Sequence, residues 1–88
     1  MVKRGKLEIM RDILNIIQQN KNFIKPTPLL RKSGISSARF KEYYLELLER
    51  QLIKEISQKD KHVILTEKGF KFLERYKVIV DFIDEFEL

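Results

Sequence analysis

Residues 27–53 constrain the fold of this chain most, because they read as a short helix, a tight turn and a longer helix. Pro28 suits a first helical turn, since its missing N–H would have no partner there, and Thr27 before it can cap the helix. Gly34 lies where a helix ends in a left-handed residue that glycine adopts without steric cost. Ser36 is a good N-cap for the longer helix. The apolar residues of that helix recur at helical spacing and predict one buried face; they are Phe40, Tyr44, Leu47 and Leu48.

A helix-turn-helix of this kind can place its second helix in the major groove of DNA, with the N-terminal residues nearest the bases. With Phe40 pointing inward, the outward residues include Arg39, which suits guanine, and two serines that suit phosphates. Glu46 and Glu49 would repel phosphates, so we expect shallow, N-terminal insertion. The alternatives are a solvated charged face and an αα-hairpin in an unrelated helical domain. The DNA-contacting residues predicted from this helix are Ser36, Ser37, Arg39, Lys41 and Tyr43.

The charge is divided unevenly along the 88 residues, whose net charge is +5. Residues 1–65 carry 14 Lys/Arg and 7 Asp/Glu, whereas residues 66–88 carry 4 and 6. The basic excess therefore lies with the helix-turn-helix, and the tail is acidic. We predict two units, a DNA-binding domain at 1–65 and a continuous dimerisation helix at 66–88.

A helix is predicted from Lys6 to Gln19, after a short basic arm in which Arg4 and Lys6 are candidates for phosphate contact. Its main apolar stripe recurs at i, i+3, i+4 and i+7. Ile9 and Ile16 lie beside that stripe and make the apolar face unusually wide. This helix is either central to the fold or in contact with a second subunit.

A two-stranded hairpin is predicted after the longer helix, from the segments LIKEIS and HVIL on either side of a polar turn at 58–61. Directly behind a helix-turn-helix, such a hairpin is the wing of a winged helix. Lys59, Lys61 and His62 near its tip would contact phosphates or a minor groove. The alternative is an ordinary hairpin whose turn is polar because turns are polar.

The last helix is predicted from a Thr66 cap to about Phe86, with a small penalty for Gly69. It carries more apolar residues than one small domain can bury, so a partner helix is expected. Basic residues in its first half and acidic ones in its second half favour an antiparallel homodimer crossing near residues 76–79. The alternative is packing on the first helix of the same chain. The predicted interface residues are Ile9, Ile16, Phe72, Tyr76, Ile79, Val80, Ile83 and Phe86.

Several function classes find no support in the sequence. It has no cysteine and a single histidine, so neither a disulfide nor a metal site is expected. No phosphate loop or nucleophile–base pair indicates an enzyme, and no cofactor or small-molecule ligand is evident. No apolar run is long enough to cross a bilayer. We expect a cytoplasmic, nucleoid-associated protein.

Four segments, in this order, resemble one protein family: KRGKLEIMRDIL, TPLL with GIS in the turn, YYLELLERQLI, and ILTEKGFKFL. The chain is similar to archaeal winged-helix DNA-binding proteins that dimerise through a long C-terminal helix, a group that includes small Sulfolobus chromatin proteins and transcription regulators. The resemblance implies a mainly α fold with a small β-hairpin, a winged helix-turn-helix followed by an antiparallel coiled coil. Members often have glycine where this chain has Gln51.

The resemblance also implies a homodimer that binds double-stranded DNA. Three functions stay open: a transcription regulator that reads spaced half-sites, a sequence-independent architectural chromatin protein, and a winged helix used for protein contacts.

Overall fold

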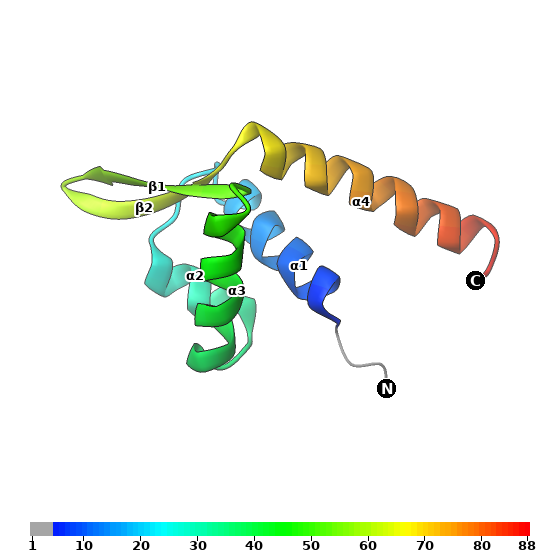
Figure 1. Cartoon of the computed structure of the whole chain (residues 1–88), viewed down its shortest axis with the longest axis horizontal. Coiled ribbons are helices and arrows are strands. Elements are labelled where there is room, and N and C mark those ends of the chain that lie inside the picture. Colours follow the sequence, from blue (N-terminus) through cyan, green and yellow to red (C-terminus); the bar gives the residue numbers. More distant parts are fainter. Residues whose placement is uncertain (1–4) are drawn as a thin grey trace.

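Four helices and one β-hairpin make up residues 5–88, the part of the chain that this computed structural model describes (Figure 1). Helices α1, α2 and α3 lie together beside the base of the hairpin, which projects away from them, while α4 extends to the opposite side. The predicted fold class, mainly α with a small hairpin and a long C-terminal helix, is confirmed. In chain order the elements are α1 (Lys6–Gln19), α2 (Pro26–Ser33), α3 (Ser37–Glu49), β1 (Ile53–Gln58), β2 (Asp60–Leu65) and α4 (Glu67–Glu85).

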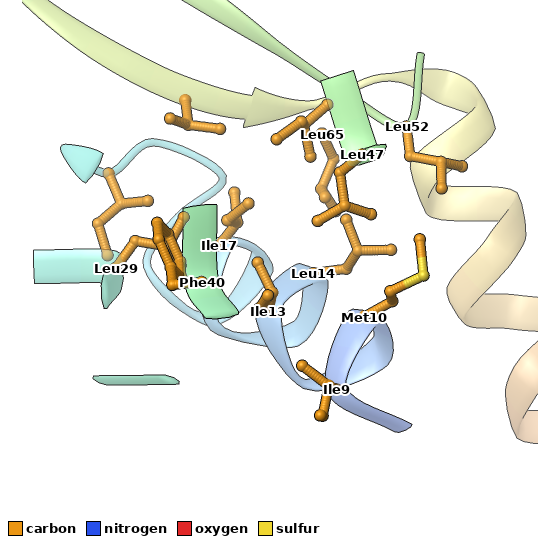
Figure 2. Close-up of a cluster of buried hydrophobic side chains, with 13 residues drawn as sticks. Ile9, Met10, Ile13, Leu14, Ile17, Leu29, Phe40, Leu47, Leu52 and Leu65 are labelled. Atoms are coloured by element: carbon orange, nitrogen blue, oxygen red, sulfur yellow. The ribbon is translucent and has the colours of Figure 1, made fainter. Parts of the chain in front are cut away.

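Helix α1 is the centre of the core and contacts the other three helices and β2. It begins and ends at the predicted residues. Figure 2 shows its side chains meeting residues from α2, α3 and the hairpin. This central position explains the wide apolar face. Ile9 is 2% exposed within the single chain and Ile16 is half-buried against the core, which agrees with the first of the two alternatives, a helix central to the fold. A role of Ile9 and Ile16 in a dimer interface stays a prediction.

The helix-turn-helix has the predicted turn, but its first helix begins two residues earlier than expected. Pro26, not Pro28, takes the first helical position, so Thr27 lies inside α2 and does not cap it. Gly34 ends α2 in the left-handed conformation with φ 72°, as predicted. Ile35 is half-buried against the core, and Ser36 caps α3. The apolar face of α3 is confirmed, because Phe40 and Leu47 are buried.

The hairpin is longer and its turn tighter than the sequence predicted. Strands β1 and β2 pair antiparallel from Ile53↔Leu65 to Gln58↔Asp60, which leaves Lys59 alone at the tip with φ 68°. Ile24, in the connection before α2, adds an isolated bridge to Val63. The base of the hairpin is thereby joined to the core.

The junction between α3, β1 and α4 depends on close backbone contacts. Thr66 Oγ1 accepts a hydrogen bond from the Gly69 N–H (3.1 Å) and donates one to the Gln51 carbonyl (2.6 Å). Gln51 has φ 61°, the left-handed conformation that glycine adopts at the lowest cost. A Cβ on Gly69 would lie 2.2 Å from the Leu52 carbonyl oxygen. Gly69 is therefore required by close packing, which its helix propensity alone did not indicate.

Only the first half of α4 lies on the core. Phe72 and Leu73 pack against it, and the Arg11 guanidinium lies 5.0 Å from the centre of the Tyr76 ring. The second half extends beyond α1, as Figure 1 shows, and its apolar side chains are exposed. The alternative prediction, that the last helix packs on the first helix of the same chain, therefore holds for the first half of α4 only. The exposed apolar residues of the second half and the tail are Val78, Ile79, Phe82, Ile83, Phe86 and Leu88.

Candidate nucleic-acid interface

The first turn of α3 presents an exposed polar surface held by its cap. Ser36 Oγ accepts a hydrogen bond from the backbone N–H of Arg39 (3.3 Å), which fixes the start of the helix. Ser37, Arg39 and Lys41 are all exposed. Free backbone N–H groups at this end, together with the helix dipole, favour an anion such as a phosphate. These predicted contact residues therefore lie together on one accessible surface.

Arg39 lies against Tyr43, one turn further along α3. Its guanidinium carbon is 5.9 Å from the centre of the Tyr43 ring, and Nη2 is 3.4 Å from the Tyr43 hydroxyl oxygen, which accepts a weak hydrogen bond. Tyr43 itself is half-buried against the core. The aromatic ring thus limits the directions in which the guanidinium can point, so Arg39 is partly ordered before any ligand is bound.

The hairpin carries the second group of predicted residues, and its cations differ in their surroundings. Lys59 at the tip is exposed. Lys61 Nζ lies 3.5 Å from Glu55 Oε2 on the facing strand. His62 stacks on Phe23, with ring centres 3.9 Å apart and 13° between the planes. Lys59 is therefore the most available cation of the wing, while Lys61 and His62 are held against neighbouring side chains.

Glu55 also joins the hairpin to α3. The Tyr44 hydroxyl donates a hydrogen bond of 2.5 Å to Glu55 Oε2. Partial burial of Tyr44, followed by this bond and the carboxylate charge, raises the pKa of the hydroxyl above its ordinary value, so it stays a donor. The chain of contacts Tyr44–Glu55–Lys61 fixes the wing relative to α3.

Lys6 belongs to a different part of the surface. Its ammonium lies 2.7 Å from Glu46 Oε2, which also accepts a hydrogen bond from Arg50 (2.8 Å). Glu46 is nine residues beyond Ser37, about 14 Å along α3. Lys6 is thus separated from the first turn of α3. The predicted candidate Arg4 lies outside the described residues.

Glu46 was expected to face a phosphate backbone, and the structure gives it another role. Hydrogen bonds from Lys6 and then Arg50 hold the pKa of this carboxyl below its ordinary value of 4.5. Its charge is therefore matched within the chain. Glu49 is exposed, so one of the two acids that argued against deep insertion keeps that effect.

Sequence reasoning missed other basic residues near these elements. Arg31 and Lys32 are both exposed in the last turn of α2, shortly before the Gly34 turn. Their place beside the turn was a signal that could have identified them. Lys25 lies 3.1 Å from Asp60 on the hairpin, a contact between distant segments that no local pattern indicates.

Other kinds of site find no support among residues 5–88. Within that range no three His, Cys, Asp or Glu side chains are grouped as a metal site would need. Among the helices described there, none is long and apolar enough to cross a membrane.

Three helices with a tight α2–α3 turn, followed by a hairpin with a cation at its tip, define the winged helix-turn-helix class. A family model described as winged helix-turn-helix matches residues 3–84, and the chain belongs to this family. The resemblance found in the sequence is thereby confirmed.

A solved structure with a similar fold is that of Sso10a-2, described as a DNA-binding protein from Sulfolobus solfataricus. The two chains are 22% identical and superpose with a TM-score of 0.77 over 96% of this chain and 86% of the other. At this identity the likeness concerns the fold. A search of curated proteins gave no match.

Proposed function

We propose that this chain binds double-stranded DNA, with the first turns of α3 at the major groove and the wing on the adjacent backbone. The observation that carries the proposal is the Tyr44–Glu55–Lys61 contact, which holds two exposed basic elements in one fixed relation. A rigid pair of elements can contact one duplex without first being ordered. The basic excess of residues 1–65 and the fold shared with a DNA-binding protein also support it.

Phosphate contacts supply most of the affinity in this proposal. Arg39 is the residue placed to reach a base edge, because it lies in the first turn of α3 and a guanidinium suits guanine. The lysines and serines suit phosphates, which carry no sequence information. The proposed contact residues are Arg31, Lys32, Ser36, Ser37, Arg39, Lys41, Tyr43, Lys59, Lys61 and His62.

We further propose that two copies pair through α4 in antiparallel orientation. The support is its exposed apolar face, where Ile79 and Phe82 are 57% and 56% exposed. A face of this kind is costly to leave in water, and a twofold dimer is the commonest way to cover it. Antiparallel pairing places the basic first half of one helix beside the acidic second half of the other. Ile83 and Phe86 belong to the same proposed interface, with half-buried Phe72, Tyr76 and Val80 beside them.

A homodimer holds two winged helices at a fixed separation, which suits a transcription regulator that reads two half-sites. An architectural chromatin protein is the second candidate, favoured by the many lysines outside α3 and by Glu49 on it, since phosphate contact needs no sequence code. Either function would place the protein at the nucleoid. A winged helix that binds only other proteins is the third candidate.

The test is binding to a random duplex across a salt series, with selection from a random pool at one of those salts. DNA binding predicts a steep fall of affinity with salt. Enrichment of an inverted repeat identifies a regulator, and absence of enrichment identifies an architectural protein. No binding at low salt contradicts the proposal and favours a protein-binding module.

Two lysine variants make the binding test specific to the wing. Lys59→Gln keeps a side chain with a Cβ at the left-handed tip and removes only the charge. It is expected to weaken binding equally across sequences and to reduce the salt slope by about one. Lys77→Gln on α4 is the matched control and should bind as the unaltered chain does. Equal affinity for both variants would remove the wing from the interface.

Homodimer formation has its own test. Replacing Ile79 and Ile83 with Asp should give a folded monomer, because both side chains are exposed in the single chain. Light scattering measures the mass, and circular dichroism reports the helices. Leu45→Asp, at an exposed leucine on α3, is the control that leaves the mass unchanged. A dimer that survives the double substitution contradicts pairing through α4.

A further inference from the structure

A basic pocket of about 400 Å³ lies where α1, α3 and α4 meet, on the side of the molecule away from the first turn of α3. Its floor is apolar and is formed by Leu7, Met10, Leu52 and Phe72. Figure 2 shows Met10 and Leu52 lying beside the first turns of α4. Its rim carries three cations, Lys6, Arg50 and Lys68. This combination suits an occupant with apolar side chains and negative charge.

The rim has more positive charge than its own chain neutralises. Glu46 is the one carboxylate among the lining residues, and it contacts both Lys6 and Arg50. Lys68 Nζ donates a hydrogen bond of 2.9 Å to the Arg50 carbonyl, a neutral acceptor. Three cations against one carboxylate leave a net charge of +2 at this pocket. An anionic occupant would therefore be stabilised there.

The pocket opens on the same side of α4 as the exposed apolar face. Phe72 and Phe86 are 14 residues apart, which is about four turns of helix, so the directions of their side chains around the helix axis differ by only about 40°. Ile79 lies midway between them. A line of apolar residues therefore runs about 21 Å along one side of α4, from half-buried Phe72 in the pocket to exposed Phe86 at the other end. A helix that covers this face must also pass the pocket.

Antiparallel pairing determines which part of a second copy arrives there. This step rests on the homodimer proposed above. If two antiparallel α4 helices cross at Ile79, a residue before Ile79 in one copy faces the residue that lies the same number of positions after Ile79 in the other copy. Phe86 of one copy then faces Phe72 of the other, so the end of α4 reaches the pocket. Residues 84–88 read DEFEL, three acids with two apolar residues.

The end of α4 is shaped to present these side chains together. Glu87 adopts the left-handed conformation with φ 54°, and the Leu88 N–H donates to the Ile83 carbonyl (3.0 Å). This is the hydrogen bond of a Schellman motif, which brings Leu88 back beside Ile83. Phe86 and Leu88 are 57% and 80% exposed in the single chain. The segment is therefore ordered but uncovered.

We propose that the basic pocket between α1, α3 and α4 binds residues 84–88 of a second copy of this chain. Phe86 and Leu88 lie on the apolar floor, and the acids face Lys6, Arg50 and Lys68. Each copy gives its tail to the pocket of the other, so the dimer has two such contacts. Because Lys6 and Arg50 also contact Glu46 of α3, this contact holds the C-terminal end of α3 against the α4 helix of the second copy.

Cross-linking between two single-cysteine variants tests this placement, since the chain has no cysteine of its own. Leu7→Cys in the pocket is mixed with isotopically labelled Leu88→Cys, and a bismaleimide is added. Mass spectrometry then counts cross-linked pairs that contain one chain of each kind. Leu45→Cys replaces Leu7→Cys in the control, because Leu45 is similarly exposed (52% against 58%) but lies outside the pocket. We expect the pocket pair to exceed the control by roughly tenfold.

Light scattering on the unmodified chain separates the two proposals. A dimer with equal cross-linking for both pairs overturns the pocket contact and leaves the homodimer intact. A monomer overturns both.

The rate at which each variant's thiol reacts with a soluble maleimide gives a second readout. If the Leu7→Cys thiol of the dimer reacts as fast as the Leu45→Cys thiol, the pocket is not covered and the proposed contact is overturned. The pocket would then be open to another ligand, such as an apolar carboxylate. Slow reaction of the Leu7→Cys thiol, together with preferential cross-linking, supports it.

Discussion

The two halves of α4 have the same apolar spacing and opposite surroundings. In residues 67–76, Phe72 and Leu73 pack on the core and Tyr76 lies under Arg11. In residues 77–85, Ile79 and Phe82 are more than half exposed. The comparison shows that apolar periodicity identifies a face that needs to be covered. It does not say whether the same chain or another molecule covers it.

The largest expected difference comes from two truncations, one in α1 and one in the second half of α4. Leu14→Ala removes a fully buried side chain and should lower the free energy of unfolding by about 3 kcal/mol at every protein concentration. Phe82→Ala should lower it by less than about 0.5 kcal/mol in dilute protein. Its effect should grow with concentration, because the lost contacts are those with a second copy.

Urea unfolding at two protein concentrations measures both effects. A loss for Phe82→Ala that equals the loss for Leu14→Ala at the lower concentration would mean that the second half of α4 is covered within its own chain. A loss that stays small at high concentration would mean that Phe82 is not in a dimer interface.

Much of the fold could be predicted because its signals are local. The cap at Ser36, the left-handed Gly34 and the α1 periodicity depend on residues within one or two turns. The burial of Ile9 depends instead on how α1 sits among the other elements, which a helical period does not contain. The start of α2 was misplaced because two prolines, Pro26 and Pro28, suit a first turn equally well.

Gly69 gives the next largest effect, at the junction that positions the covered half of α4. Helix propensity alone predicts that Gly69→Ala stabilises by about 1 kcal/mol. Its Cβ would lie 2.2 Å from the Leu52 carbonyl oxygen, so we expect a loss of about 2 kcal/mol or more. Gly5→Ala is the control, because within residues 5–88 no atom beyond its chain neighbours lies within 4 Å of the added Cβ, and it should lose less than about 1 kcal/mol. A gain in Tm for Gly69→Ala would contradict the close contact.

The site was predicted less completely than the fold, because its ion pairs depend on register. The sequence predicts Lys59 and Lys61 as cations of the wing, but it predicts a turn of four residues, 58–61. With Lys59 alone at the tip, Glu55 is diagonal to Lys61 on the facing strand and can pair with it. The sequence alone predicts that Glu46 faces the groove, because its partner Lys6 is 40 residues away and no local pattern indicates their contact.

A smaller effect of opposite sign is expected at Gln51, before the covered half of α4. Its φ of 61° is unfavourable for a residue with a Cβ, so Gln51→Gly should raise the free energy of unfolding by about 1 kcal/mol. Gln58→Gly is the matched control at a strand residue outside the left-handed region, and it should lose about 0.5–1 kcal/mol. Thermal unfolding compares the two; a loss at both positions would show that Gln51 side-chain contacts outweigh its backbone conformation.

The smallest expected effect is the pH dependence of the Glu46 contacts, where the covered half of α4 meets α3. Hydrogen bonds from Lys6 and Arg50 lower the pKa of Glu46 below 4.5, so the unfolded chain binds the proton more readily than the folded one. The stabilisation is therefore fully present above pH 4.5 and is lost as the pH falls below it.

Glu46→Gln removes this carboxylate and should lower the free energy of unfolding at neutral pH. The difference from the unaltered chain should shrink as the pH falls below 4.5 and Glu46 of that chain takes up its proton. Glu49→Gln removes an exposed carboxylate of α3 outside the Lys6–Glu46–Arg50 contacts, so it measures the general effect of losing one negative charge there. Urea unfolding at pH values above and below 4.5 measures both variants. If the difference in free energy of unfolding between Glu46→Gln and the unaltered chain is constant with pH, the carboxylate charge does not hold Lys6 and Arg50. The basic pocket beside α4 then carries more free positive charge than its geometry indicates.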